Sequence, residues 1–314
     1  MRAFALEQFG GPGSLQEVPD PRPGAGELLV RVRASSLNAM DWKVGKGYVK
    51  DFMEHRFPLV LGLDFAGAVE DLGQGVADFE PGQAVFGAAG KPVMGNGTLA
   101  ELATVSAATA VAKPASIEDR VAATLPTAGC TALMGVEAVQ PSQGDAVLVV
   151  GAAGGVGSFA VQLAASRGAD VIGVATSSNA DYVRELGASE LIDYTSEDLV
   201  EAVRRRRRSG LAAIIDLVSD AATLGRLSEL VRDGGVIVSA LSAAPAEGAA
   251  PRGIRGVNLG GTVNRERLQA LASAVEQGEL KPPAIKTFSL QQAAEALLEA
   301  QSGHVRGKLV VTVS

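Results

Sequence analysis

A run of glycine and alanine between two apolar segments constrains the fold of this chain more than any other feature. The apolar residues 147–150 lead into the sequence GAAGGVG at residues 151–157, and a helix-length segment follows. Ala152, Gly154 and Gly157 occupy the three small-residue positions of the G-x-G-x-x-G pattern, with alanine at the first. A strand, a glycine-rich turn and a helix N-terminus together offer free backbone N–H groups to a phosphate. The pattern therefore predicts a dinucleotide site.

The composition and length fit a globular chain of two domains. Of 314 residues, 47% are hydrophobic and 20% are charged, as in ordinary globular proteins. The net charge of −7 argues against nucleic acid as a partner, because a phosphate backbone attracts an excess of Lys and Arg. The sequence has no apolar run of about 18 residues to span a membrane. A single cysteine, Cys130, excludes an intrachain disulfide. We expect a cytoplasmic protein.

The spacing of apolar residues changes along the chain. Residues 1–110 hold short alternating apolar runs separated by Gly and Pro, which favours a β-rich unit. From about residue 118, strand-like and helix-like segments alternate, which is typical of βαβ units and a parallel sheet. The tail has two helix-like segments, 264–277 and 289–301, and a closing strand at 307–313. We predict an α/β protein. One economical interpretation returns the tail to the first domain, which would make the parallel-sheet domain an insertion; periodicity alone does not establish this topology.

Six further motifs lie along the chain. They are SLNAMDWK (36–43), LGLDFAG (61–67), PGQAV (81–85), GTLAE (97–101), LPTAGCTA (125–132) and GHVRGK (303–308). Together with the glycine-rich loop, they resemble the medium-chain dehydrogenase/reductase superfamily, in its zinc-independent, zeta-crystallin-like quinone oxidoreductase branch. The resemblance implies a GroES-like β-rich catalytic domain, residues 1–117 and 263–314, and a doubly wound Rossmann domain, residues 118–262. It also implies a homodimer.

The residues at the zinc-ligand positions of related enzymes do not suit zinc. Asn38 stands near the place of their first cysteine, and Gly62-Leu63-Asp64 replaces Gly-His-Glu. Residues 87–98 contain none of the four cysteines of a structural zinc lobe. Tetrahedral zinc needs thiolate or imidazole ligands, and the two histidines of the chain lie far apart in the sequence. We therefore expect no metal and no zinc-dependent alcohol dehydrogenation.

The end of the second strand of the nucleotide domain favours NADPH. NAD enzymes place an acid there to accept a hydrogen bond from the ribose 2′-OH, but this chain has Ala175. Ser177, Ser178 and Asn179 can donate to a 2′-phosphate, and by resemblance Tyr182 matches a tyrosine of that pocket, whose lysine is missing. The same polar turn could instead cap the next helix, and the two roles are compatible. The expected cofactor residues are Thr127, Thr131, Ala152, Gly154, Gly155, Val156, Gly157, Ser177, Ser178 and Tyr182.

Hydride transfer from a nicotinamide needs a well-placed acceptor, exclusion of water and a donor near the developing oxyanion. By resemblance, the segment with Asn38, Lys43 and Tyr48 lines the nicotinamide cleft, so these three are the catalytic candidates. Lys43 could stabilise an enolate, and Tyr48 could donate a proton. In the alternative interpretation, Lys43 pairs with Asp41. Asp64 could orient Lys43 or only satisfy backbone donors.

These features predict an NADPH-dependent reductase of a quinone or another α,β-unsaturated carbonyl. An enoyl-thioester reductase is the second enzymatic possibility, and a non-catalytic NADPH-binding structural or regulatory protein is a third. The basic run Arg204–Arg208 is expected to be the solvated end of a helix that begins with acids. Cys130 is expected to be a small buried hydrophobe rather than a catalytic thiol.

Overall fold

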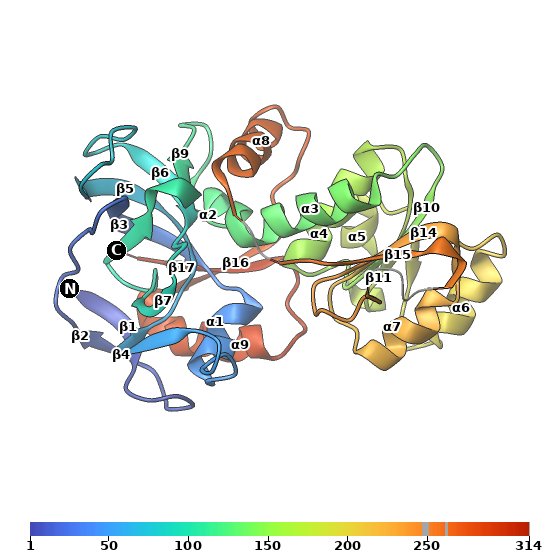
Figure 1. Cartoon of the computed structure of the whole chain (residues 1–314), viewed down its shortest axis with the longest axis horizontal. Helices are drawn as coiled ribbons and strands as arrows, with labels where there is room; N and C mark the ends of the chain where they lie inside the picture. The colour runs from blue at the N-terminus through green and yellow to red at the C-terminus, as the bar shows by residue number, and fades with distance from the viewer. Residues whose placement is uncertain (247–250, 261–262, 314) are drawn as a thin grey trace. The chain divides into compact units, whose positions relative to one another are not determined.

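Strand β17 (Lys308–Thr312), at the end of the chain, pairs antiparallel with β3 (Glu27–Ser36), near its beginning. Both ends of the chain therefore belong to one folded unit. The computed structural model describes residues 1–246, 251–260 and 263–313. It divides into one unit of Met1–Cys130 with Val263–Ser314 and a second unit of Thr131–Thr262 (Figure 1).

The first division lies at Cys130/Thr131 and not at residues 117/118, where the sequence placed it. Helix α2 (Asp119–Ala122) contacts β3 and β5 (Asp64–Leu72). The π-helix η2 (Leu125–Gly129) contacts β5 and β6 (Ala84–Ala88). This connecting segment therefore packs on the sheet of the first unit, a long-range contact that the change in periodicity does not reveal.

The first unit contains two β-sheets. One has the order β2-β1-β4-β7, with the strands Ser14–Glu17, Arg2–Leu6, Glu54–Val60 and Val93–Asn96. The other has the order β16-β17-β3-β5-β6-β9, and β8 also pairs with β3; β16 is Ile285–Ser289, β9 is Ala110–Ala112 and β8 is Leu102–Ser106. The helices and 3₁₀ turns of this unit include α1 (Ala39–Gly45), η1 (Ala107–Thr109), α8 (Arg265–Glu276), η5 (Leu290–Gln292) and α9 (Ala293–Gln301).

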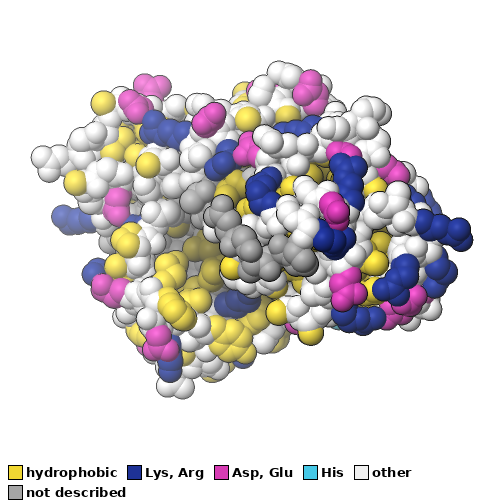
Figure 2. All heavy atoms as spheres, turned by 45° about the vertical axis from the view of Figure 1, so that its right-hand side comes forward, with side chains coloured by type: hydrophobic (Ala, Val, Ile, Leu, Met, Phe, Trp, Pro, Cys, Tyr) yellow, Lys and Arg dark blue, Asp and Glu magenta, His cyan; other side chains and the backbone are white. Residues whose placement is uncertain are grey.

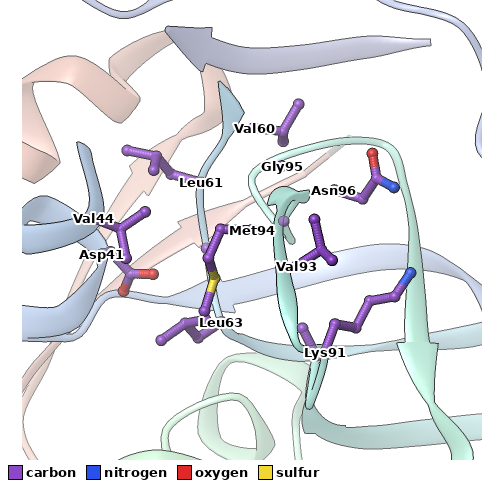
Figure 3. A pocket seen from close by; sticks show the side chains of 13 residues that line it. Asp41, Val44, Val60, Leu61, Leu63, Lys91, Val93, Met94, Gly95 and Asn96 are labelled. Atoms are coloured by element: carbon purple, nitrogen blue, oxygen red, sulfur yellow. The ribbon is translucent and has the colours of Figure 1, made fainter. Parts of the chain in front are cut away.

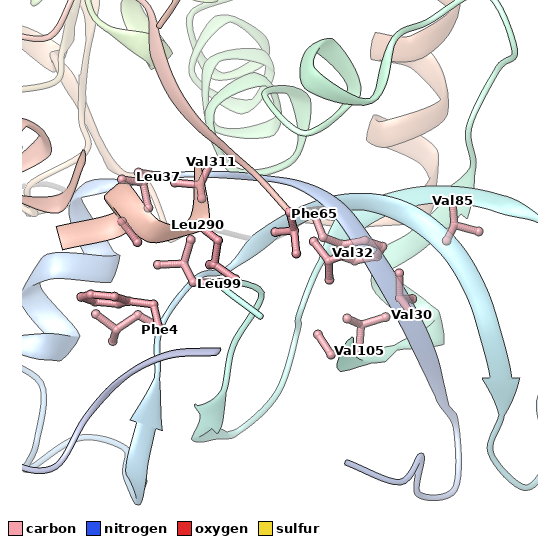
Figure 4. Close-up of a cluster of buried hydrophobic side chains, with 14 of the residues drawn as sticks. Phe4, Val30, Val32, Leu37, Phe65, Val85, Leu99, Val105, Leu290 and Val311 are labelled. Carbon is pink, nitrogen blue, oxygen red and sulfur yellow. The ribbon is translucent and has the colours of Figure 1, made fainter. Parts of the chain in front are cut away.

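The side chains in the middle of β3 alternate between core and solvent. Val30 and Val32 are buried and Arg31 and Arg33 are exposed, whereas consecutive residues are buried towards both ends of the strand. This alternation is the period-2 pattern of a strand with one covered face. The buried side chains join one apolar cluster with residues from the other strands and from the chain end (Figure 4).

The second unit is a six-stranded parallel sheet of order β12-β11-β10-β13-β14-β15. In that order the strands are Glu190–Ile192, Asp170–Val174, Ala146–Val150, Leu211–Asp216, Val231–Ser239 and Arg255–Asn258. The helical segments are α3 (Cys130–Val139), α4 (Gly155–Ser166), η3 (Ser177–Asn179), α5 (Ala180–Glu185), α6 (Leu199–Arg206), α7 (Ala221–Ser228) and η4 (Pro251–Gly253). The predicted α/β class and doubly wound sheet are confirmed.

Two strands were missed by the sequence analysis. β15 continues the parallel sheet after β14, and β16 lies in the segment expected to connect two helices. Both strands are at the edge of a sheet, and most of their side chains are exposed or half-buried. Edge strands of this kind lack the apolar run that identifies a strand in a sequence.

Candidate functional site

The glycine-rich segment forms the turn between β10 and α4. Gly151 has φ +84°, in the region that favours glycine. A Cβ atom on Gly157 would lie 2.1 Å from the carbonyl oxygen of Gly151, so the turn has no room for a side chain there. Gly154 is the N-cap of α4, a helix of 12 residues whose first turn contains Gly155 and Val156. Its free N–H groups and its dipole favour an anion at this end.

The position of this turn in the sheet also fits a dinucleotide. β10 is flanked by β11 on one side and β13 on the other, so the chain order reverses beside it. Open parallel sheets bind ligands beyond the carboxyl ends of the strands at such a point. Ala152 is fully buried and adds no polar group to the turn. The cradle therefore fits the pyrophosphate of a dinucleotide.

The polar turn after β11 bonds partly to itself. Ala175 is buried at the end of the strand, and Ser177 and Ser178 are exposed. The hydroxyls of Thr176 and Ser178 are 2.9 Å apart, and Asn179 Nδ2 donates to Thr176 Oγ1 at 3.0 Å. Within the described residues, no side-chain hydrogen bond caps η3 or α5, the helix on which Tyr182 is half-buried. The alternative interpretation of this turn as a helix cap is therefore not supported.

Asp193, which the sequence analysis missed, lies beside this turn. It follows β12, the neighbour of β11 in the sheet. Its carboxylate accepts the Thr195 hydroxyl at 2.6 Å and the backbone N–H of Ser177 at 2.9 Å. These hydrogen bonds, those from Thr195 foremost, lower the pKa of Asp193 to about 2, so it is ionised at neutral pH. A negative charge therefore stands next to the residues expected to hold a 2′-phosphate.

Three charged side chains are buried together in the first unit. Asp41, Asp64 and Lys308 are 1%, 0% and 4% exposed. Lys308 Nζ donates to the Leu37 carbonyl and to Asn38 Oδ1, each at 2.7 Å. Asn38 Nδ2 in turn donates to Asp64 Oδ2 at 2.9 Å. The Asn38 amide therefore links the ammonium to a carboxylate.

Asp64 collects donors from separate parts of the chain. The Ser36 hydroxyl at the end of β3 donates to Oδ2 at 3.2 Å. From η2, the hydroxyl of Thr127 donates to Oδ1 at 2.6 Å, and its backbone N–H also points to the carboxylate. Because the Thr127 hydroxyl proton is engaged, this group can only accept a hydrogen bond from a further ligand. Thr131, the other threonine of the motif, is half-buried on α3 in the second unit.

Burial dominates the electrostatics of this cluster. It raises the pKa of Asp64 and lowers that of Lys308, since each charged form loses its hydration. It raises the pKa of Asp41 to about 7. The backbone N–H of Asn38 opposes this rise, and the charge of Asp64 adds to it. The attraction of Lys308 for both carboxylates keeps these shifts smaller than burial alone would make them.

The predicted catalytic residues lie in two different surroundings. Asn38 belongs to the buried cluster. Lys43 on α1 and Tyr48 after it lie around Trp42 instead: Lys43 Nζ is 5.8 Å from the Trp42 ring centroid, and the Tyr48 ring meets the same ring edge-on at 5.8 Å. Tyr48 is 65% exposed. The structure therefore does not bring the three residues into one contact group.

The cation of the buried cluster is Lys308 and not Lys43. Within the described residues, no ion pair joins Lys43 to Asp41 or to Asp64, the two partners considered from the sequence. Lys308 lies in the motif GHVRGK, which was noted only for its resemblance. Its contact with Asn38 spans 270 residues of sequence, and no local pattern predicts such a contact.

Away from the cluster, the predicted burial of Cys130 is confirmed, and the predicted solvated basic helix end is confirmed in part: Arg204, Arg205 and Arg208 are exposed, whereas Arg206 and Arg207 are half-buried. The arginines at the end of α6 form ion pairs with acids around them: Arg204 with Glu201, Arg205 with Glu197, Arg206 with Glu190 and Glu197, and Arg207 with Asp170 and Glu190. On the face in Figure 2, basic side chains are likewise interspersed with acidic ones. Cys130 is 1% exposed, with its thiol not in a disulfide. Among the helices described, none has the length and apolar character to cross a membrane.

Replacing Lys308 tests whether the buried ammonium holds the cluster together. Lys308→Met would leave buried carboxylates without their cation, and we expect a loss of about 3–5 kcal/mol in the free energy of unfolding, measured with urea. Lys286→Met on the neighbouring strand β16 is the control, because its ion pair with Glu299 is largely exposed. It should cost less than about 1 kcal/mol. Equal losses in the two variants would contradict the assignment.

Comparison with known proteins agrees with this architecture. Residues 24–115 match the family model for the alcohol dehydrogenase GroES-like domain, and residues 186–311 match that for zinc-binding dehydrogenase. The chain is similar to the quinone oxidoreductase of Coxiella burnetii, with a TM-score of 0.87 and 33% identity over 100% of this chain and 99% of that chain.

Curated relatives match over nearly the whole chain. Quinone-oxidoreductase QR1, chloroplastic, of Triphysaria versicolor is 33% identical over 99% of this chain and 98% of its own length. The NADPH-dependent alkenal/one oxidoreductase, chloroplastic, of Arabidopsis thaliana is 30% identical over 99% of this chain and 79% of its own. The resemblance noted in the motifs is confirmed: the chain belongs to the quinone oxidoreductase family of the medium-chain dehydrogenase/reductase superfamily, and it is an oxidoreductase.

Proposed function

We propose that the protein is an NADPH-dependent, zinc-independent reductase that transfers hydride to a quinone or another α,β-unsaturated carbonyl. The glycine cradle at the carboxyl end of β10 carries this proposal, since its shape and its free N–H groups suit a dinucleotide pyrophosphate. Of the three similar proteins named above, two are named quinone oxidoreductases and one an NADPH-dependent alkenal/one oxidoreductase. Both substrates are conjugated electrophiles, so one chemistry covers them.

The choice of NADPH rests on the turn after β11. Ala175 offers no carboxylate to a ribose 2′-OH, and Ser177 and Ser178 expose hydroxyls that can donate to a 2′-phosphate. Asp193 opposes such a phosphate electrostatically, but its carboxylate also fixes the Ser177 backbone. The preference for NADPH over NADH is therefore proposed as a balance between these hydroxyl donors and one nearby negative charge.

The residues around Asn38 support a reaction without zinc. An amide, two carboxylates and an ammonium meet there, and the amide oxygen already accepts from Lys308. Catalytic zinc takes His, Cys and carboxylate ligands with one open position, and an ammonium at 2.7 Å from the candidate ligand would repel it. The chemistry of this donor set thus does not fit a zinc ion.

When bound, the nicotinamide supplies the hydride. In this proposal the chain contributes binding and orientation: Gly154, Gly155 and Val156 hold the pyrophosphate, and Lys43 or Tyr48 donates to the acceptor oxygen. The hydrogen bonds of Asn38 to Lys308 and Asp64 make it a positioning residue. Two further parts of the proposal are a homodimer, which the family resemblance implies, and a cytoplasmic location, which was expected from the sequence.

An acceptor screen tests the function directly. With NADPH as donor, we expect steady oxidation in the presence of 9,10-phenanthrenequinone or a short-chain enone, and slower oxidation with NADH. The same panel includes a coenzyme A enoyl thioester. Fast NADPH oxidation with this acceptor alone would instead indicate an enoyl-thioester reductase. Tight NADPH binding without turnover on any acceptor would instead indicate a structural or regulatory protein.

The double variant Ser177→Ala/Tyr182→Phe tests the 2′-phosphate site. Loss of hydrogen bonds to a charged phosphate should raise the KM for NADPH at least about tenfold. The KM for NADH should stay nearly unchanged, because that cofactor carries no 2′-phosphate. Steady-state kinetics with both cofactors measures this, and equal effects on the two would rule the assignment out.

Asp193→Asn tests the opposing charge. The amide oxygen can still accept from Ser177, while the negative charge disappears, so the KM for NADPH should fall by about two- to fivefold. The KM for NADH should not fall with it. Asp233→Asn is the matched control, because Asp233 is an exposed aspartate near the opposite, amino-terminal edge of the same parallel sheet. A similar fall for both variants would reveal a general effect of net charge.

Lys43→Met tests the oxyanion donor. Removing the ammonium should lower kcat by about 10²-fold, the scale of one lost oxyanion contact. The affinity for NADPH, followed by fluorescence titration, should be unchanged. Lys46→Met, an exposed lysine at the end of the same helix, is the control and should retain full turnover. Wild-type kcat in Lys43→Met would leave Lys43 with a structural role beside Trp42.

A further inference from the structure

The buried cluster of Asp41, Asp64 and Lys308 contains two acids and one base. If all three were ionised, a net negative charge would lie out of contact with water. An uncompensated buried charge is costly, and proteins neutralise it by a proton or by a partner ion. The cluster therefore needs one further positive charge to be neutral. The hydrogen bonds of the two carboxylates indicate which of them binds it.

Only one oxygen of the two carboxylates is without a partner among the described residues. Both oxygens of Asp64 accept hydrogen bonds from the chain. Asp41 Oδ2 accepts the backbone N–H of Asn38 at 2.7 Å. Asp41 Oδ1 is buried and accepts no hydrogen bond from the described residues. A buried carboxyl oxygen without a partner is destabilising unless a proton, an ion or a water molecule completes it.

A small cavity lies against Asp41. Its volume is about 30 Å³, and its apolar wall includes Val44, Leu63, Val93 and Met94 (Figure 3). A single water needs about 10–15 Å³ measured in this way, so the space holds one or two waters and no larger ligand. In Figure 3 the Asp41 carboxylate is directed to the side of Leu63 and Met94. The cavity thus has room for a water molecule beside the Asp41 carboxylate.

The charged groups around this carboxylate do not supply the missing positive charge. Lys308 is shared with Asp64 through Asn38. Lys91, which also lines the cavity, forms an ion pair with Glu27 at 2.9 Å, and in Figure 3 its ammonium points away from Asp41. Lys43 on the same helix lies over Trp42. The backbone N–H of Gly62 faces the Asp41 carboxylate and partly opposes the rise of its pKa. Among the described residues, Oδ1 nevertheless accepts no hydrogen bond.

We propose that Asp41 is a proton-binding site: Oδ1 carries a proton and donates it to a water molecule in this cavity, which leaves the cluster neutral as a whole. The water accepts this hydrogen bond and, through it, Asp41 exchanges its proton with solvent. The raised pKa of Asp41, about 7, agrees with this assignment. When the proton leaves, the cluster gains a negative charge that holds the proton of Lys308 more tightly. The inference does not depend on the proposed function.

Infrared spectroscopy of the full chain tests the proton. In the C=O stretching region of protonated carboxylic acids, we expect one band at pH 6 that disappears as the pH rises towards 9. Asp41→Asn should lose this band, and Asp51→Asn, an exposed aspartate shortly after α1, should keep it. If wild type and Asp41→Asn show the same spectra at every pH, Asp41 is ionised throughout and the proposal is overturned.

Stability against pH gives a second measurement. The pKa of Asp41 in the folded chain lies above its ordinary value of 3.8, so the folded chain binds this proton more tightly than the unfolded chain. Its contribution is therefore complete below about pH 4 and is lost as the pH rises through about 7. The free energy of unfolding of wild type should fall over this range relative to that of Asp41→Asn. A constant difference between the two would contradict the proposal.

Further experiments test whether a water molecule or a metal cation, rather than nothing, lies beside Asp41 in the cavity. A crystal structure should show a water at hydrogen-bond distance from Asp41 Oδ1, and Leu63→Phe, which fills the space, should shift the carboxylic acid band. A crystal structure with no water in the cavity would overturn the proposal. A carboxylic acid band that does not shift in Leu63→Phe would also overturn it, because the proton would then not be donated to a water there. A stabilisation by sodium or potassium over choline in wild type alone, with no acid band, would replace the proton by a cation and also overturn it.

Discussion

The hydrogen-bond chain Lys308–Asn38–Asp64 is the interaction on which the first unit depends. It joins the last strand of the chain, the start of α1 and the strand β5, and Thr127 extends it to η2. These segments lie far apart in the sequence, and all of them bring polar groups into an apolar surrounding. Because a buried polar group is stable only when its partners are in place, the cluster fixes the relative positions of the four segments more strictly than apolar packing alone.

The sequence predicted best what is encoded locally. The glycine-rich turn and the parallel sheet around it follow from periodicity and from glycine at a crowded turn. The return of the tail to the first unit was expected from the family resemblance, because periodicity alone does not determine which strands pair. The buried cluster could not be predicted in the same way. Asn38, Asp64 and Lys308 all lie in recognisable motifs of the sequence. Nothing in these motifs indicates that Lys308 contacts Asn38, because only the pairing of β17 with β3 brings the two residues together.

The turn after β11, where the nucleotide is expected to bind, likewise includes a contact that the sequence alone does not predict. Ala175 and Ser177 follow β11 directly, so they can be identified from this one segment of the sequence. Asp193 follows a different strand, and its contact with Ser177 exists because β11 and β12 are neighbours in the sheet. A residue that acts across two adjacent strands is visible in the sequence only after the strand order is known. The proposed preference for NADPH therefore involves residues at the ends of two neighbouring strands.

The pairing of β17 with β3 also affects the order in which the two units can fold during synthesis. The second unit is continuous in sequence and can fold as soon as it has left the ribosome. The first unit cannot complete its larger sheet until residues 308–312 are synthesised, since β17 lies between β16 and β3. Until then Asp41 and Asp64 have no ammonium to balance them. Residues 308–312 thus complete the larger sheet and supply the one ammonium of the buried cluster, so a chain that lacks them lacks both.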